Sequence, residues 1–195
     1  MNTLFQSLGR TVLAGFALLV LLVILAGSPV VDLRSHAWWM FAFRWLHVTA
    51  AIMWVGLLWY FNFVQIPAMP RIPDEQKPAI TKVIAPSALY WFRYAALATV
   101  IMGLGLASMN GYILPALALR APFTPIGIGM WLGLIMAFNV WFIIWPMQKK
   151  ALGMVPVEIT GKARAVRVAM LTSRINTMLS IPMVYCMVAQ QHGGL

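Results

Sequence analysis

The chain alternates between long apolar segments and short polar connections. Each apolar segment reaches the roughly 20 residues that a helix needs to cross a hydrocarbon core about 30 Å thick. In lipid these segments must be helical, because an open strand would leave backbone N–H and C=O groups unpaired. The pattern therefore predicts an all-α integral membrane helical bundle with five transmembrane helices, over residues 11–31, 38–65, 89–112, 125–147 and 168–190.

We expect one membrane domain over residues 1–195, with 11–31 as an added anchor and the other four helices as its core. The anchor resembles a signal peptide, but its apolar run is longer than a typical signal core, so we predict that it stays uncleaved. The connection over residues 66–88 contains five prolines, counted along the sequence. These predict an irregular loop with at most a short surface helix over Pro78–Ile84.

Positive charges gather on one side of the predicted membrane. Only Arg34 and Arg120 lie on the opposite side. The positive-inside rule therefore places the N-terminus in the cytoplasm and the C-terminus in the periplasm of a bacterial inner membrane. The cations on the cytoplasmic side are Arg10, Arg71, Lys77, Lys82, Lys149, Lys150, Lys162, Arg164 and Arg167.

Composition supports this interpretation. Hydrophobic residues make up 62% of the chain, and 14 Lys and Arg against 4 Asp and Glu are too few charges for a soluble domain. The net charge of +10 is spread over the connections, so we expect the lipid bilayer as partner and no nucleic acid. Cys186 is the single cysteine, which excludes a disulfide within the chain and a CxxCH haem-attachment motif.

Polar side chains inside the spans are candidate site residues, because burying them in lipid is costly. No Asp or Glu lies in a predicted span, which argues against transport driven by protons or sodium. The three arginines among the candidates lie near span ends, where snorkelling to lipid headgroups is the simplest interpretation. The candidates are Arg44, His47, Asn62, Arg93, Asn139, Arg174 and Asn176.

His47 is the only histidine inside a span. Arg44 precedes it by one helical turn and Trp54 follows by two turns, so the three share a face. An imidazole beside a cation suits a b-type haem, with His47 bound to the iron and Arg44 paired with a propionate. A methionine would be the second axial ligand, chosen among Met102, Met109, Met130, Met183 and Met187. The alternative is that His47 bonds a neighbouring helix and the methionines only fill space.

Small residues recur at four-residue spacing on two of the predicted helices. Gly103 and Ala107 form such a ridge on the third helix, and Gly129, Gly133 and Ala137 form one on the fourth. Small residues allow two membrane helices to approach closely. We therefore expect the third and fourth helices to pack against each other.

Three segments carry a more specific pattern: FRWLHVTAAIMWVG from Phe43, MAFNVWFIIWPMQKK from Met136, and SRINTMLSIP from Ser173. Together with the YWFR sequence from Tyr90, they resemble the membrane domain of bacterial PuuD-type urate hydroxylases, in the same order from about residue 38 onward. The RWLH start of the second helix is also similar to HemJ-type protoporphyrinogen oxidases, over that one helix.

The resemblance implies a membrane oxidase module that passes electrons from urate to a c-type cytochrome. Full-length members carry that cytochrome fused outside the membrane, and we expect this chain to lack it. The residues that match the family pattern are His47, Trp54, Asn139, Arg174 and Asn176. With Arg44 they form the predicted cofactor-binding set, in which His47 holds the haem iron.

Three positions depart from the family. Ile175 replaces a common histidine, and Tyr90 and Ala95 stand where a histidine and a glutamate are common. None of the three replacements ligates haem well or moves protons at neutral pH. Urate oxidation by this chain alone is therefore not expected, and whether the chain is an enzyme stays open. Two functions remain: a haem b redox module working with a separate periplasmic c-type cytochrome or larger complex, and a non-catalytic accessory subunit of a membrane complex.

Overall fold

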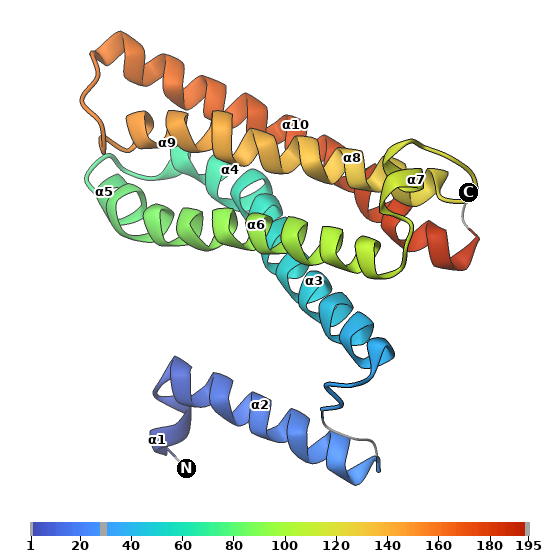
Figure 1. Ribbon diagram of the computed structural model, residues 1–195. Coiled ribbons are helices and arrows are strands. Elements are labelled where there is room, and N and C mark those ends of the chain that lie inside the picture. Colours follow the sequence, from blue (N-terminus) through green and yellow to red (C-terminus); the bar gives the residue numbers. More distant parts are fainter. Residues whose placement is uncertain (1, 28–30, 194–195) are drawn as a thin grey trace. The chain divides into compact units, whose positions relative to one another are not determined.

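The computed structural model describes residues 2–27 and 31–193, so residues 28–30 of the predicted first span lie outside the described residues (Figure 1). Every regular element in the described ranges is a helix. The chain divides into two compact units, residues 1–41 and 42–195. The predicted fold class is thus confirmed as all-helical, while the prediction of one domain stays a prediction.

The first unit contains α1 (Asn2–Phe5) and α2 (Leu8–Leu25). No residue of α2 is buried, so its apolar surface is uncovered on all sides. A helix that is apolar all round and has no buried residue is typical of a membrane span. This unit also holds the start of α3 (His36–Trp59), where the Ser35 hydroxyl accepts a hydrogen bond from the Trp38 backbone N–H at 3.2 Å.

The second unit contains four long helical segments. The first continues from α3 through η1 (Tyr60–Gln65), α4 (Ile66–Ala68) and η2 (Met69–Arg71). The next comprises α5 (Lys77–Ala79), η3 (Ile80–Ile84) and α6 (Ala85–Met109). After the short α7 (Ile113–Leu117), the third comprises α8 (Thr124–Phe138), η4 (Asn139–Ile144) and α9 (Trp145–Ala151). The last is α10 (Ile159–His192), which packs along α8, η4 and α9 (Figure 1).

The predicted irregular loop over residues 66–88 is wrong in extent, because helices fill all of it except residues 72–76. Three π-helical turns explain how the prolines are accommodated. The turns η1, η3 and η4 each end two residues before a proline, namely Pro67, Pro86 and Pro146. A proline ring clashes with the carbonyl four residues earlier, and a wider turn relieves that clash.

Four helical segments in the described ranges are long and apolar enough to cross a membrane: Leu8–Leu25, His36–Arg71, Lys77–Met109 and Thr124–Ala151. The fifth predicted span corresponds to α10, which has 34 residues but is not among the four. Its basic first turns and its polar residues, such as Ser173 and Asn176, lower its mean hydropathy. The number five and the orientation of the termini therefore remain predictions.

The core of the second unit lies where these segments meet. Its largest fully buried side chains include Trp54 and Leu58 of α3, Phe92 of α6 and Met136 of α8. Between membrane helices, such contacts stabilise through dispersion rather than through release of water. The core therefore holds α3, α6 and α8 together at mid-length.

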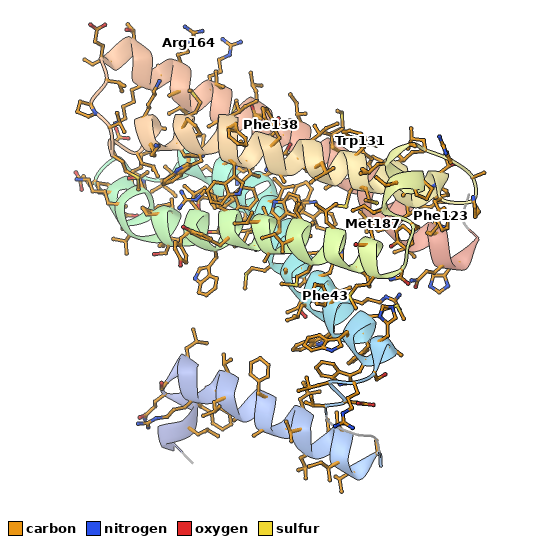
Figure 2. The ribbon with its side chains drawn as sticks, in the orientation of Figure 1. Phe43, Phe123, Trp131, Phe138, Arg164 and Met187 are labelled. Carbon is orange, nitrogen blue, oxygen red and sulfur yellow. The ribbon has the colours of Figure 1, made fainter. Side chains whose placement is uncertain are left out.

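The third and fourth helices contact each other as predicted, because α6 packs on α8 and Ala107 shares a buried cluster with Met130. Other small residues of these helices face different partners. A Cβ atom on Gly129 would lie 3.2 Å from Cβ of Cys186, so Gly129 faces α10. A Cβ atom on Gly105 would lie 2.6 Å from the Phe43 ring, which projects from α3 (Figure 2). The sequence spacing identified close-packing faces, but it carried no information about which partner each of these small residues meets.

Candidate functional site

A cavity of about 780 Å³ lies between α3, α6, α8 and α10 in the second unit. This volume falls within the roughly 300–1,000 Å³ that is typical of small-molecule and cofactor pockets. Most of the lining is apolar, and its polar members include Arg44, His47, Trp54, Thr99 and His192. The cavity is therefore suited to a largely apolar molecule that also carries polar groups.

His47 is held in the cavity wall by one hydrogen bond. Its Nδ1 atom lies 2.8 Å from the backbone carbonyl oxygen of Thr99. Because a carbonyl only accepts, Nδ1 carries the proton and donates, which leaves the Nε2 lone pair available. A histidine that binds a metal usually donates from its other ring nitrogen to a carbonyl or carboxylate in this way, which fixes the orientation of the ring.

Gly103 allows the His47 ring to lie against α6. A Cβ atom at this position would lie 2.8 Å from both Nδ1 and Cε1 of His47. No ordinary side-chain carbon approaches a ring this closely, so only glycine fits without moving the histidine. Gly103 therefore provides the space in which the His47 ring lies.

Arg44 and Trp54 line the same cavity as His47, as their shared helix face predicts. Trp54 is 1% exposed, and its Nε1 atom is buried without a hydrogen-bond partner in the described part of the chain. Arg44 is exposed. The cavity thus offers a cation that a bound acid group could meet, while the Trp54 N–H is buried in the packing.

Three of the five candidate methionines line the cavity: Met130, Met183 and Met187. Met187 lies on the side of α10 that faces α8 (Figure 2), with its Cε atom 3.3 Å from where a Cβ of Gly129 would be. Met102 and Met109 are not part of the lining. His192, at the end of α10, also lines the cavity, and sequence reasoning missed it because it follows the last predicted span.

Asn139 and Asn176 form a separate cluster outside the cavity lining. Asn139 Nδ2 donates to Asn176 Oδ1 at 2.8 Å, and Asn176 Nδ2 donates to the Met136 carbonyl at 3.0 Å. The Asn176 side chain is 0% exposed. These bonds fasten α10 to α8 and η4, so the geometry gives both residues a role in helix packing. Their predicted contact with a cofactor stays a prediction.

Sequence reasoning missed two further bonds of this kind. Asn62 Nδ2 donates to Ser173 Oγ at 2.8 Å, and Trp59 Nε1 donates to Ser180 Oγ at 2.9 Å. Ser173, Asn176 and Ser180 recur at three- and four-residue spacing on α10, a signal that could have identified one polar face. Polar side chains thus tie α10 to α3 and η1 as well as to α8.

The two remaining arginines differ in burial. Arg174 is exposed and lies outside the cavity lining, so its predicted place in the cofactor set stays a prediction. Arg93 is only 9% exposed, and its guanidinium carbon lies 3.2 Å from the centre of the Trp145 ring. A tryptophan from another helix therefore covers Arg93, and its predicted contact with lipid headgroups stays a prediction.

The chain has been compared with known proteins. Residues 112–195 match the family model described as urate oxidase N-terminal. Over these residues the chain is similar to that family. The match includes the segments from Met136 and Ser173 that suggested the resemblance, which is confirmed there. The segments from Phe43 and Tyr90 lie outside it, so over those residues the resemblance stays a prediction. No curated protein and no solved structure matches the chain.

The matched segment, residues 112–195, covers less than half of the 195 residues, but it forms a large part of the cavity wall. It supplies Tyr112, Met130, Met183 and His192. The opposite wall, with Arg44, His47 and Trp54, comes from residues before the matched segment. The cavity therefore forms between the matched segment and residues that precede it in the chain.

Proposed function

We propose that this urate-hydroxylase-like membrane protein is a redox module that binds a b-type haem in the cavity through His47. It would pass electrons to a separate periplasmic c-type cytochrome or a larger membrane complex. The observation that carries the proposal is the bond from His47 Nδ1 to the Thr99 carbonyl, which leaves Nε2 available in a cavity of about 780 Å³.

The residues present fit a haem. Arg44 is an exposed cation of the cavity that can pair with a propionate, and Met130, Met183 and Met187 offer thioether sulfur atoms. His192 is a further nitrogen donor in the same lining. A bound haem would supply one-electron redox chemistry, while the protein residues hold it and exclude water.

The departures from the family leave this cavity intact. Tyr90, Ala95 and Ile175 are not part of its lining. Tyr90 and Ile175 are exposed on the outside of their helices, and Ala95 is buried in the apolar core. The loss of ionisable groups at these three positions therefore removes nothing that holds a haem at His47, which supports the redox module.

A reduced-minus-oxidised absorption spectrum of the purified protein tests the proposal, because a b-type band requires bound haem. The alternative, an accessory subunit of a larger complex, is supported by exposed aromatic side chains on α3 and η1. Trp59, Tyr60 and Phe63 are exposed there, whereas Trp54 and Phe61 are used in the chain's own core. An accessory subunit would give a featureless spectrum.

We also propose that α10 crosses the membrane as the fifth span. Its polar side chains Ser173, Asn176 and Ser180 are buried against neighbouring helices. The outward face of the same stretch is largely apolar, although it also carries Arg174, and its exposed apolar residues include Leu171, Ile175, Met178, Ile181, Val184 and Val188. A helix with its polar groups bonded inside a bundle and an apolar outer face is suited to lipid despite a modest mean hydropathy.

Five spans with the basic connections in the cytoplasm place the C-terminus in the periplasm. Alkaline phosphatase fused after Leu195 is therefore expected to be active, because this reporter folds only outside the cytoplasm. The same reporter inserted in the connection 152–158, between α9 and α10, serves as the matched control and is expected to be inactive. Enzyme assays on whole cells measure both fusions. The reverse pattern would contradict the orientation, and equal activities would contradict a membrane-spanning α10.

A further inference from the structure

A second candidate binding site lies at the basic end of the bundle, around Arg93. The guanidinium of Arg93 lies over the face of Trp145, the first residue of α9. Lys149, in the last turn of α9, lies over the same ring, with its Nζ atom 5.6 Å from the ring centre. Two cations from different helices therefore flank one indole.

Two of the three nitrogen atoms of the Arg93 guanidinium lack a hydrogen-bond partner in the described residues. Nε and Nη1 are both buried and have no hydrogen-bond partner in the described ranges. A guanidinium has five N–H donors and no acceptor. When it lies over an aromatic face, its N–H bonds do not point at the ring, so the ring does not satisfy them. The packing thus buries a charged group while leaving its Nε and Nη1 donors without acceptors.

Trp141 adds another unpaired donor beside Arg93. Its Nε1 atom is buried without a partner in the described residues, and its ring centre lies 6.0 Å from the Arg93 guanidinium carbon. The Tyr94 ring packs edge-on against Trp141 at 5.7 Å between centres. The neighbourhood therefore holds buried N–H donors on two helices and two positive charges.

No acidic residue lies on the helices that carry Arg93, Trp141 and Lys149. The four acidic residues of the chain are Asp32, Asp74, Glu75 and Glu158, all outside these helical stretches. Buried charged donors without a partner are costly, and an acceptor with negative charge would stabilise them. A group with only acceptor oxygens and a negative charge, such as a phosphate diester, fits this set of donors.

We propose that Arg93, Trp141 and Lys149 bind the phosphate of an anionic phospholipid at the basic end of the bundle. Basic pockets between membrane helices on the cytoplasmic side are suited to such headgroups, and tryptophans at this level match the interfacial belt. The exposed side chains of Tyr90, Trp91 and Tyr94 surround Arg93 along α6 and would contact the adjoining acyl chains. This site is separate from the cavity that contains His47.

The test measures thermal unfolding of the full chain in mild detergent with added phosphatidylglycerol or with phosphatidylcholine of the same acyl chains. We expect phosphatidylglycerol to raise the unfolding temperature more, and Arg93→Gln to weaken its apparent affinity by at least about tenfold. Trp141→Phe, which keeps the ring and removes the N–H, should give a smaller loss. Arg164→Gln is the matched control, because Arg164 is an exposed cation at the start of α10 (Figure 2).

Equal stabilisation of the wild type and Arg93→Gln by phosphatidylglycerol would overturn the proposal. So would saturation by inorganic phosphate alone, which would indicate a site for a free anion. If Arg93→Gln does not fold, native mass spectrometry of Trp141→Phe counts the retained phosphatidylglycerol, and an unchanged count against the wild type overturns the proposal as well. Any haem spectrum of the wild type should persist in Trp141→Phe, so this test and that of the cavity are independent.

Discussion

Replacing His47 with alanine is expected to abolish the b-type haem spectrum of the purified protein. The structure leaves the Nε2 lone pair of His47 available in the cavity, because Nδ1 already donates to the Thr99 carbonyl. Removing the imidazole removes the proposed iron ligand, and the methionine thioethers that remain would bind haem iron more weakly than an imidazole does. Absorbance of the reduced protein and the haem content per chain measure the effect.

Two further variants sharpen this experiment. His36→Ala removes a histidine outside the second unit and should leave the spectrum unchanged. Gly103→Ala keeps the ligand but adds a carbon 2.8 Å from the ring, so it should shift the absorbance band or lower the haem content. An unchanged spectrum in His47→Ala would exclude His47 as the ligand and leave His192 as the next candidate of the cavity.

Replacing Asn176 with leucine is expected to lower the free energy of unfolding by about 2 kcal/mol, within the roughly 1–3 kcal/mol range for leaving a buried polar group unsatisfied. Asn176 is fully buried and joins Asn139 to the Met136 carbonyl through its side-chain amide. Leucine has a similar size but leaves the Asn139 amide without its acceptor. Denaturant titration in detergent, followed by helical circular dichroism, measures the change.

Thr177→Val is the matched control for Asn176→Leu. The Thr177 hydroxyl donates only to the Ser173 carbonyl of its own helix, at 3.1 Å. Its loss should therefore change the unfolding free energy by a few tenths of a kcal/mol. Equal losses in the two variants would contradict the importance of the bonds between α10 and α8, since both would then reflect helix stability alone.

The helices could be predicted from the sequence because lipid makes one simple demand, an apolar stretch of sufficient length. The cavity face could be predicted as well, since Arg44, His47 and Trp54 are related by helical spacing alone. Both inferences use only local information. The irregular loop over residues 66–88 was wrong because rules for proline in a straight α-helix do not anticipate π-helical turns such as η1 and η3.

Apart from the contact of α6 with α8, the contacts between helices could not be predicted, because spacing identifies a face and not its partner. Gly103 meets His47 of α3, and Gly129 meets Cys186 of α10. The packing of Arg93 could not be predicted either, since nothing near it in the sequence reveals that Trp145 covers its guanidinium. The partners of the polar residues in α10 could not be predicted from the sequence either, and the structure shows Ser173 and Asn176 bonded inside the bundle.

The most direct test of haem binding at His47 is a reduced-minus-oxidised visible spectrum of the wild-type protein, purified in mild detergent from cells with ample haem. Haem binding at His47 predicts a sharp b-type band with near-stoichiometric haem. Urate and quinols would then be tested as electron donors. A featureless spectrum with no metal detected would contradict haem binding at His47 and would favour the accessory subunit.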